Sequence, residues 1–298
     1  MEESNILPVD GKVDVTASER RKNARKFYSD EGLAAVYGMS GFIRRFLHPQ
    51  SPYLIEDYRC GLILSGSLRG RTNLIERQMT AGSLVYVSPG SFVEPLDMSE
   101  DLRVYGIGMT REVFNLINLY NIPPIFRGQT KDGCVTLTES EVDFIKDMFR
   151  TLWSLLQSDS TSKETKYCIV SAFINHFNDL FSLREQSQSG VHSSTDTTFN
   201  NFIALVCADA GRHRQLSFYA DKMCITEHYL GSVIKKVSGS TAKDWIDRAA
   251  ITAAKVMLRH TDDPISTVAD KLEFPNGSFF SKYFKRLTGL TPQAFREG

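Results

Sequence analysis

The distribution of hydrophobic residues changes along the chain. Between residues 53 and 108, short hydrophobic runs alternate with clusters of Gly, Pro and Ser, as where Leu84–Val87 is followed by Ser88–Gly90. Short strands separated by turn residues are typical of a small β-sandwich or β-barrel. We therefore predict a β-rich structure for this part of the chain.

Two later segments have the spacing of amphipathic helices. Hydrophobic residues recur at three- and four-residue steps in 139–156 and again in 167–181, which places them on one helical face. The first set is Val142, Ile145, Met148, Phe149, Leu152 and Leu156, and the second is Tyr167, Val170, Phe173, Ile174, Phe177, Leu180 and Phe181. These stripes exceed what one small barrel needs, so we expect this domain to form a homodimer.

Polar segments divide the chain into domains. Residues 1–30 are polar and contain a basic cluster from Arg20 to Lys26, which fits a solvated helix or a nucleic-acid-binding arm. Residues 185–198 are rich in Ser, Thr and Gln without periodic hydrophobic residues, as in a flexible linker. We predict a polar leader at 1–30, a first domain at 31–184, a linker at 185–198 and a second domain at 199–298.

Charge is distributed unevenly between these parts. The chain has 35 Lys and Arg against 35 Asp and Glu. Residues 199–298 hold 14 of the basic and 10 of the acidic residues, which leaves 21 basic and 25 acidic residues in 1–198. The second domain therefore has a net charge of +4 and the rest of the chain −4, and a basic domain suits a polyanionic partner.

Cysteine usage and hydropathy indicate the compartment. The five cysteines show neither a C-x-x-C pair nor a metal-ligand spacing, so we expect reduced thiols. No N-terminal stretch is of the signal-peptide type, and no segment approaches the roughly 18 apolar residues of a membrane span. We expect a soluble, cytoplasmic protein without a membrane partner.

The most informative pattern is an internal repeat in the second domain. The matching segments are 220–223 with 269–272, 230–234 with 280–284, and 235–239 with 285–289. Each copy predicts a short helix, a turn, and a second helix that ends in two basic residues and a glycine. This is the order of elements in a helix-turn-helix unit.

Residues at the helix ends support this prediction. Thr226 and Asn276 precede the second helices and can accept hydrogen bonds from their first turns, whereas Gly239 and Gly289 suit a left-handed end. At the start of the two short helices we expect Ser217 as a cap in one and Pro264 as the first residue in the other.

The segment 241–260 lies between the two units. It begins with the capping pair Thr241 and Asp244 and continues with helical spacing, so it predicts a long helix that joins the units. If this helix separates the units by roughly 34 Å, both second helices can enter successive major grooves of B-DNA.

With these features the second domain resembles the DNA-binding domain of the AraC/XylS family of bacterial transcription regulators. The resemblance covers residues 199–298, and its most specific part is the ending FF-x-x-x-FKR-x-x-G-x-TP-x-x-FR. It implies a sequence-specific transcription regulator, of the activator kind, at the nucleoid in the cytoplasm, with promoter DNA and RNA polymerase as partners. The chain departs from the family pattern at Pro275, Asn276 and Gly277, which leaves the base preference of the last reading helix open.

The family pattern also implies which residues face DNA. In the first unit these are His228, Tyr229, Gly231 and Ser232, with Lys235 near phosphate, and in the second Asn276, Gly277, Ser278, Phe279 and Lys282, with Lys285 and Arg286 towards the backbone. Lys282 can donate to guanine or phosphate, whereas the glycines only allow close approach. Phe279 fits a thymine-methyl contact and a core position equally well.

The first domain resembles the cupin-type β-barrel that often precedes this DNA-binding domain, mainly in its segment 81–90. The barrel region contains only His48 and the chain has no H-x-H pair, so we expect no metal, no other cofactor and no catalytic residue. A barrel can enclose a small-molecule effector. The candidate polar lining residues are Arg59, Arg69, Arg71, Arg103 and Tyr105.

The predicted fold class is α+β, a cupin-like barrel with amphipathic helices followed by an all-α domain of two helix-turn-helix units. The leading hypothesis is a regulator whose first domain senses a small molecule and dimerises. The alternatives are a ligand-independent regulator whose barrel only dimerises, and a metal-dependent cupin enzyme with a DNA-binding domain. A closed polar cavity favours the first, a filled barrel the second and a bound transition metal the third.

Overall fold

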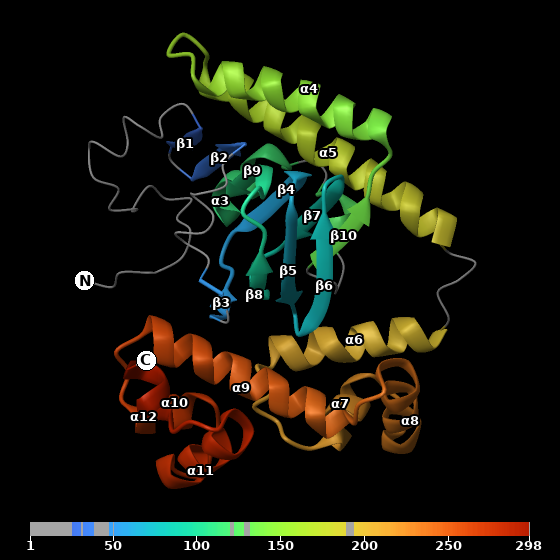
Figure 1. The fold of residues 1–298 in the computed structure, drawn as a ribbon. Helices are drawn as coiled ribbons and strands as arrows, with labels where there is room; N and C mark the ends of the chain where they lie inside the picture. Colours follow the sequence, from blue (N-terminus) through green and yellow to red (C-terminus); the bar gives the residue numbers. More distant parts are fainter. Residues whose placement is uncertain are drawn as a thin grey trace.

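The chain forms a β-rich N-terminal domain that lies on a helical C-terminal domain (Figure 1). The computed structural model describes residues 26–30, 32–38, 48–49, 51–119, 122–127, 132–188 and 194–297. The predicted order of a β-rich domain and a helical domain is confirmed. No helix in these ranges is long and apolar enough to cross a lipid bilayer.

Two antiparallel sheets make up the N-terminal domain in the described ranges. The larger sheet has the strand order β1-β2-β9-β4-β7-β10, and the smaller has the order β3-β8-β5-β6. The strands of the larger sheet are β1 (Phe27–Asp30), β2 (Leu33–Tyr37), β4 (Tyr58–Ser65), β7 (Ser83–Val87), β9 (Arg103–Met109) and β10 (Asp132–Thr136). Those of the smaller sheet are β3 (Tyr53–Leu54), β5 (Ser67–Thr72), β6 (Ile75–Thr80) and β8 (Phe92–Met98).

Side chains alternate between the two faces of these strands, as strand geometry requires. On β4, Cys60 and Leu62 belong to the hydrophobic cluster beneath the helices, whereas Ile63 belongs to a smaller cluster that includes Met79 and Leu102. A Cβ atom at Gly61 would lie 2.8 Å from the carbonyl oxygen of Tyr105, so glycine is needed where β4 pairs with β9.

Two long helices, α4 (Glu139–Leu156) and α5 (Lys163–Gln188), cross over the larger sheet (Figure 1). Their predicted apolar stripes are buried: Phe149, Phe173 and Phe177 share one cluster with Leu84 of β7. The shorter elements of this domain are α3 (Arg111–Ile117) and the 3-10 helix η1 (Pro124–Phe126). The amphipathic spacing therefore predicted both long helices correctly.

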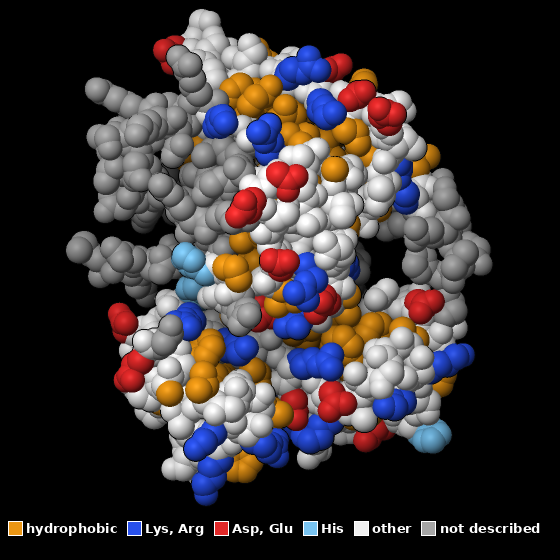
Figure 2. Space-filling view, viewed as in Figure 1, with side chains coloured by type: hydrophobic (Ala, Val, Ile, Leu, Met, Phe, Trp, Pro, Cys, Tyr) orange, Lys and Arg blue, Asp and Glu red, His pale blue; other side chains and the backbone are white. Residues whose placement is uncertain are grey.

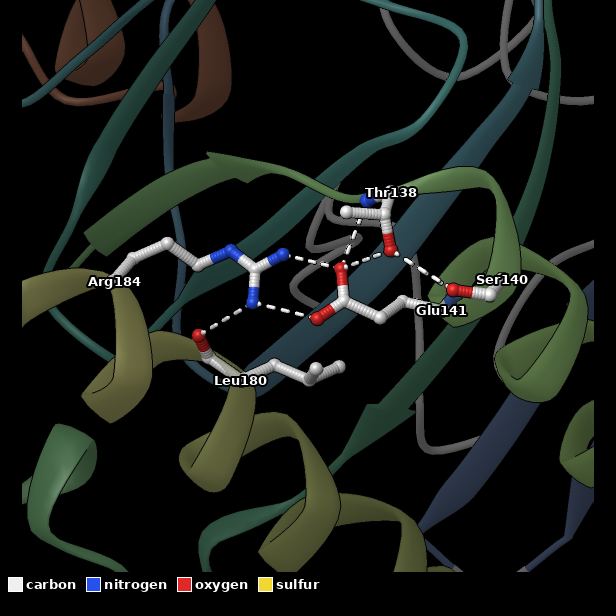
Figure 3. A network of polar contacts seen from close by, with 5 residues as sticks. All are labelled: Thr138, Ser140, Glu141, Leu180 and Arg184. Carbon is white, nitrogen blue, oxygen red and sulfur yellow. Dashed lines mark hydrogen bonds and ion pairs between the residues drawn. The ribbon is translucent and has the colours of Figure 1, made fainter. Parts of the chain in front are cut away.

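A polar network joins α4 to α5 on the surface (Figure 3). Glu141 completes a capping box with Thr138: its carboxylate accepts from the Thr138 N–H at 2.8 Å, and the Thr138 hydroxyl accepts from the Glu141 N–H. The same carboxylate accepts two hydrogen bonds from the guanidinium of Arg184, which also donates to the Leu180 carbonyl oxygen. These hydrogen bonds, Arg184 first among them, lower the pKa of Glu141 from 4.5 to about 2.

The C-terminal domain consists of helices in the described part of the chain. They are α6 (Ser194–Ala208), α7 (Leu216–Lys222), α8 (Glu227–Ser238), α9 (Ala242–His260), α10 (Ile265–Lys271), α11 (Gly277–Thr288) and α12 (Pro292–Glu297). The long helix α9 begins with the predicted Thr241–Asp244 capping box. At 1.5 Å per residue its 19 residues span about 28 Å.

Two predicted starts of short helices are wrong. Helix α7 begins at Leu216 after Gln215, so Ser217 lies one position inside the helix and caps nothing. Pro264 is the residue before α10 and not its first residue. Both errors are small because short helices carry few end signals.

Two predicted domain edges also differ from the structure. Strand β1 lies at Phe27–Asp30, inside the predicted leader 1–30, because its residues pair with β2. The predicted linker 185–198 is partly helical, since α5 continues to Gln188 and α6 begins at Ser194. Residues 1–25 of the predicted leader, which include the basic residues Arg20 to Arg25, lie outside the described residues.

The two domains contact each other through the end of the N-terminal domain that faces α6 and α9 (Figure 1). Leu74 and Phe92 of the N-terminal domain belong to the same buried cluster as residues of the C-terminal domain. At the end of α9, the His260 ring lies 5.1 Å from the Tyr53 ring, and its Nε2–H donates to the Pro52 carbonyl oxygen at 3.1 Å. Burial lowers the pKa of His260, which favours the neutral ring in this contact.

Candidate nucleic-acid interface

Helix α8 is fixed to the domain by its apolar face. Its first turn is capped by Thr226, which accepts from the Tyr229 N–H at 3.2 Å, and it ends at Gly239 with a φ of 69°. Leu230, Val233 and Ile234 are buried. The other face carries the predicted reading residues: His228, Tyr229, Ser232 and Lys235 are exposed, and Gly231 is half-buried.

Helix α11 repeats this arrangement. Asn276 accepts from the Phe279 N–H at 2.8 Å, and Gly289 ends the helix with a φ of 81°. Phe280, Tyr283 and Phe284 are buried. The predicted reading residues Ser278, Phe279 and Lys282 are exposed, as are Lys285 and Arg286, and Gly277 is half-buried at the helix start.

The exposure of Phe279 decides between the two predictions made for this residue. Its side chain is 54% exposed, although its ring lies 6.3 Å from that of Phe274. The core interpretation is therefore wrong, and Phe279 presents an aromatic ring to solvent in the first turn of α11.

Three neighbouring hollows run from α8 to α11, and we call them together the basic groove. The α8 hollow has a volume of about 830 Å³ and is lined by Leu216, Glu227, His228, Gly231, Ser232, Lys235 and Lys236. The central hollow, of about 450 Å³, shares Leu216, Gly231 and Lys235 with it and adds Arg214, Thr241, Ala242, Lys243 and Ile246. The α11 hollow, of about 520 Å³, shares Arg214 and Lys243 and adds Glu273, Phe274, Pro275, Phe279, Lys282, Tyr283 and Arg286.

Positive charge dominates the basic groove. Its basic lining residues are Lys235, Lys236, Arg214, Lys243, Lys282 and Arg286, and its acidic lining residues are Glu227 and Glu273. In the space-filling view, Lys and Arg side chains gather along the lower edge of the molecule, over α11 and towards α8 (Figure 2). A groove of this sign attracts polyanions.

Buried polar contacts hold α11 against α9. The Tyr283 hydroxyl donates to Oδ1 of Asp247 at 2.6 Å, and both side chains are buried. Burial and this hydrogen bond raise the pKa of Tyr283, so the phenol remains a donor. The same carboxylate oxygen lies 3.4 Å from Nζ of Lys243. The position of the last reading helix is therefore fixed by a contact with the long helix.

Arg214 and Lys243 were missed by the sequence prediction. Arg214 lies in the loop before α7, and Lys243 lies in the first turn of α9, so neither belongs to a predicted reading helix. Arg214 follows Arg212 and His213, and this short basic run was an available signal. Its position in the basic groove depends on packing against residues about sixty positions later, which periodicity does not reveal.

The candidate effector residues are only partly brought together. A cavity of about 220 Å³ is lined by residues of both sheets, and its lining includes Arg59 and Tyr105 among mainly aliphatic side chains such as Val36, Leu68 and Val104. The guanidinium of Arg59 is ion-paired with Asp57 at 2.6 Å. The Tyr105 ring stacks on Phe149 of α4 at 4.5 Å, on the helix-covered side of the sheet.

The other three arginines do not line this cavity. Arg69 and Arg71 lie on β5 at positions that alternate with the cavity-lining Leu68, so they point to the other face. There they pair with Glu76, and Arg71 also pairs with Glu94. Arg103 is exposed at the start of β9. The predicted polar lining is therefore wrong for these residues, and the cavity is apolar.

Comparisons with known proteins agree on the C-terminal domain. A helix-turn-helix domain model matches residues 219–298. The transcriptional activator RhaS of Escherichia fergusonii is 27% identical over 119 residues, which cover 40% of this chain and 43% of RhaS. The arabinose operon regulatory protein of Escherichia coli is 32% identical over 79 residues, which cover 26% of this chain and 27% of that protein. The matched part thus spans less than half the length of these relatives.

A solved structure is similar over most of the chain. The structure of ToxT from Vibrio cholerae with bound unsaturated fatty acid is 16% identical, with a TM-score of 0.41, and the match covers 89% of this chain and 93% of ToxT.

The C-terminal part of the chain is a helix-turn-helix domain, with two such units on one groove. It is a domain of the AraC type, as the internal repeat and its ending predicted.

Proposed function

We propose that the chain is a sequence-specific transcription regulator that binds double-stranded promoter DNA through α8 and α11. The observation that carries the proposal is the basic groove, which brings the polar faces of both reading helices to one continuous surface. Two helix-turn-helix units joined by a helix of about 28 Å suit two successive major grooves of one duplex.

The two reading helices are proposed to contribute unequally. At equivalent positions of the repeat, α8 has Gly231 and Ser232 where α11 has Ser281 and Lys282. Lys282 can reach guanine O6 or N7, whereas α8 offers the uncharged groups of Tyr229 and Ser232, together with His228, for polar contacts. Lys235 donates to the Gly239 carbonyl oxygen at 2.6 Å, at the helix end where phosphate contacts occur. Base specificity should therefore reside mainly in α11.

The barrel cavity supports control by a small molecule. Its volume of about 220 Å³ and its aliphatic lining suit a small, mainly apolar effector, with Arg59 as the charged group at the wall. This volume is below the roughly 300–1,000 Å³ typical of ligand sites, so we propose an effector smaller than most ligands. A barrel that only supports dimerisation is the second candidate. We propose no catalytic activity.

The contact between the domains offers a route for such control. The turn between β5 and β6 is fixed by Asn73, whose side chain accepts from the Phe92 N–H at 3.0 Å and donates to Asp132 at 2.6 Å. The next residue, Leu74, has a φ of 70° and belongs to the cluster shared with the C-terminal domain. A leucine in this conformation is strained. A ligand that shifts β5 would therefore move a side chain that packs against the DNA-binding domain.

Homodimerisation and contact with RNA polymerase complete the proposal. Phe144 on α4 is 53% exposed, and hydrophobic side chains lie between charged ones over α4 and α5 (Figure 2). A second copy covering this surface would bring two DNA-binding domains to one promoter. Activation of transcription would then require a surface for RNA polymerase on the bound dimer.

Selection of bound duplexes from a random pool tests DNA reading by the full chain. We expect an enriched sequence with its most constrained block under α11, and an affinity that falls steeply with salt because bound cations release counterions from DNA. Recovery of unrelated sequences together with a flat salt response would contradict the proposal. Melting of the barrel with and without small apolar compounds tests the effector separately.

A further inference from the structure

The middle of the basic groove has no part in the proposed base reading. Arg214 and Lys243 each line both the central hollow and the α11 hollow. Neither residue lies on α8 or α11. They therefore place two cations between the reading helices, at a position that a bound duplex would have to cross.

Arg214 is a partly buried charge that makes no ion pair in the described part of the chain, although Asp247 and Asp209 lie near enough to favour its charged form. Its Nη2 donates to the Leu272 carbonyl oxygen at 3.1 Å, and its guanidinium lies 4.4 Å from the centre of the Phe274 ring and 5.7 Å from that of Tyr283. In the described part of the chain, its buried Nη1 has no hydrogen-bond acceptor, and the ion pairs there do not include it. A partly buried charge of this kind is costly unless an anion approaches it.

Lys243 is an exposed charge that lines the same two hollows as Arg214. Its side chain is 65% exposed, and its Nζ lies 3.4 Å from Oδ1 of Asp247, which also accepts the hydrogen bond from Tyr283. An ammonium has three donors, so this long contact leaves donors directed to solvent. Glu273 is the acidic side chain in the lining of the α11 hollow.

We propose that Arg214 and Lys243 bind the DNA phosphates between the two major grooves that α8 and α11 read. The inference rests on the proposed function and adds a third, central contact to the two reading helices. When two helices occupy successive major grooves on one face, the backbone that flanks the intervening minor groove faces the protein between them. A guanidinium and an ammonium both suit phosphate oxygens.

The central contact would act on register more than on sequence. Phosphate contacts position a protein on DNA but do not distinguish bases. Because Arg214 packs on Phe274 and Tyr283, and Lys243 contacts the Asp247 that holds Tyr283, both cations are anchored to the residues that place α11. The central phosphates would thus fix the distance between the two reading helices when the duplex binds.

The test compares full-length Lys243→Gln and Arg214→Met with wild type, on the duplex selected by wild type and on a scrambled duplex. Lys255→Gln is the matched control, because Lys255 is on the same helix but outside the basic groove, near the Phe295 ring. We expect Lys243→Gln to lower the affinity for both duplexes about threefold to tenfold and to reduce the slope of log affinity against log salt by about one. Arg214→Met should have the same effect if its melting temperature stays that of wild type.

Neutral methylphosphonates, placed one at a time along the selected duplex, locate the contact. We expect a central position between the two protected major grooves at which a methylphosphonate weakens binding by the wild type but does not further weaken binding by Lys243→Gln. If Lys243→Gln behaves like Lys255→Gln, and central methylphosphonates leave wild type unchanged, this inference is overturned while the proposed function stands. If wild type prefers no sequence at all, the proposed function fails and the inference falls with it.

Discussion

The ion pair between Glu141 and Arg184 leads to a quantitative prediction on the N-terminal domain. Replacing Glu141 by Gln removes the charge, but Gln can still accept from the Thr138 N–H and keep the capping box of α4. The variant therefore separates the ion pair to α5 from the helix cap. Glu139→Gln is the matched control, because Glu139 is an exposed acid in the same first turn.

The magnitude follows from the pKa of the carboxylate. Its hydrogen bonds, from Arg184 above all, lower the pKa of Glu141 from 4.5 to about 2 in the folded chain, a difference that sets an upper limit of about 3 kcal/mol on the stabilisation. The Glu141 and Arg184 side chains are 25% and 20% exposed, so solvent screening reduces the expected loss to about 1–2 kcal/mol.

The sign of the pH dependence is fixed by the lowered pKa. The stabilisation is fully present above the unfolded pKa of 4.5 and is lost as the pH falls from there to about 2. The difference in unfolding free energy between wild type and Glu141→Gln should therefore be largest at pH 7 and clearly smaller at pH 3.

Urea unfolding measures this difference. The chain has two tryptophans, Trp153 on α4 and Trp245 on α9, so a Trp245→Phe background lets fluorescence report the N-terminal domain alone. Glu139→Gln should change the free energy of unfolding by less than about 0.5 kcal/mol. A loss for Glu141→Gln that is the same at pH 3 and pH 7, or equal to that of the control, would show that the ion pair with Arg184 does not stabilise the domain.

Three further predictions concern DNA binding, the C-terminal core and assembly. Lys282→Ala should lower the free energy of binding by roughly 1–3 kcal/mol on the selected duplex and by much less on unrelated DNA, whereas Lys285→Ala should weaken binding to both DNAs by similar factors. If competition binding shows equal losses on both DNAs for Lys282→Ala, the reading face lies elsewhere. Tyr283→Phe should lower the unfolding free energy of the C-terminal domain by about 1–3 kcal/mol, because buried Asp247 keeps only the 3.4 Å contact with Lys243. An unchanged value from Trp245 fluorescence in a Trp153→Phe background would contradict this. The full chain should sediment as a dimer at micromolar concentration, and a monomer there would contradict the proposed role of the α4 and α5 surface.

Periodicity predicted the elements whose buried faces follow a regular repeat. The stripes that contain Phe149 and Phe173 lie in two helices, and Thr226 and Asn276 cap the reading helices as their side-chain chemistry indicated. Signals of this kind are local, since each needs only the residues within a turn or two.

Features that depend on distant contacts were not predictable in this way. Arg69 and Arg71 were expected at the cavity, but the register of β5 with β8 turns Leu68 inwards and these arginines outwards. Arg214 reaches the basic groove because Phe274 provides a ring for its guanidinium. In each case the position of a charge is decided by a partner strand or loop far away in sequence.

In the proposed complex, α8 and α11 occupy successive major grooves on one face of a duplex. A hydroxyl-radical footprint of the full chain on its selected duplex tests this most directly. We expect protected patches on each strand that repeat at about one helical turn, 10–10.5 base pairs, and lie on one face of the DNA. A single patch under one helix-turn-helix unit, or protection on opposite faces, would contradict it.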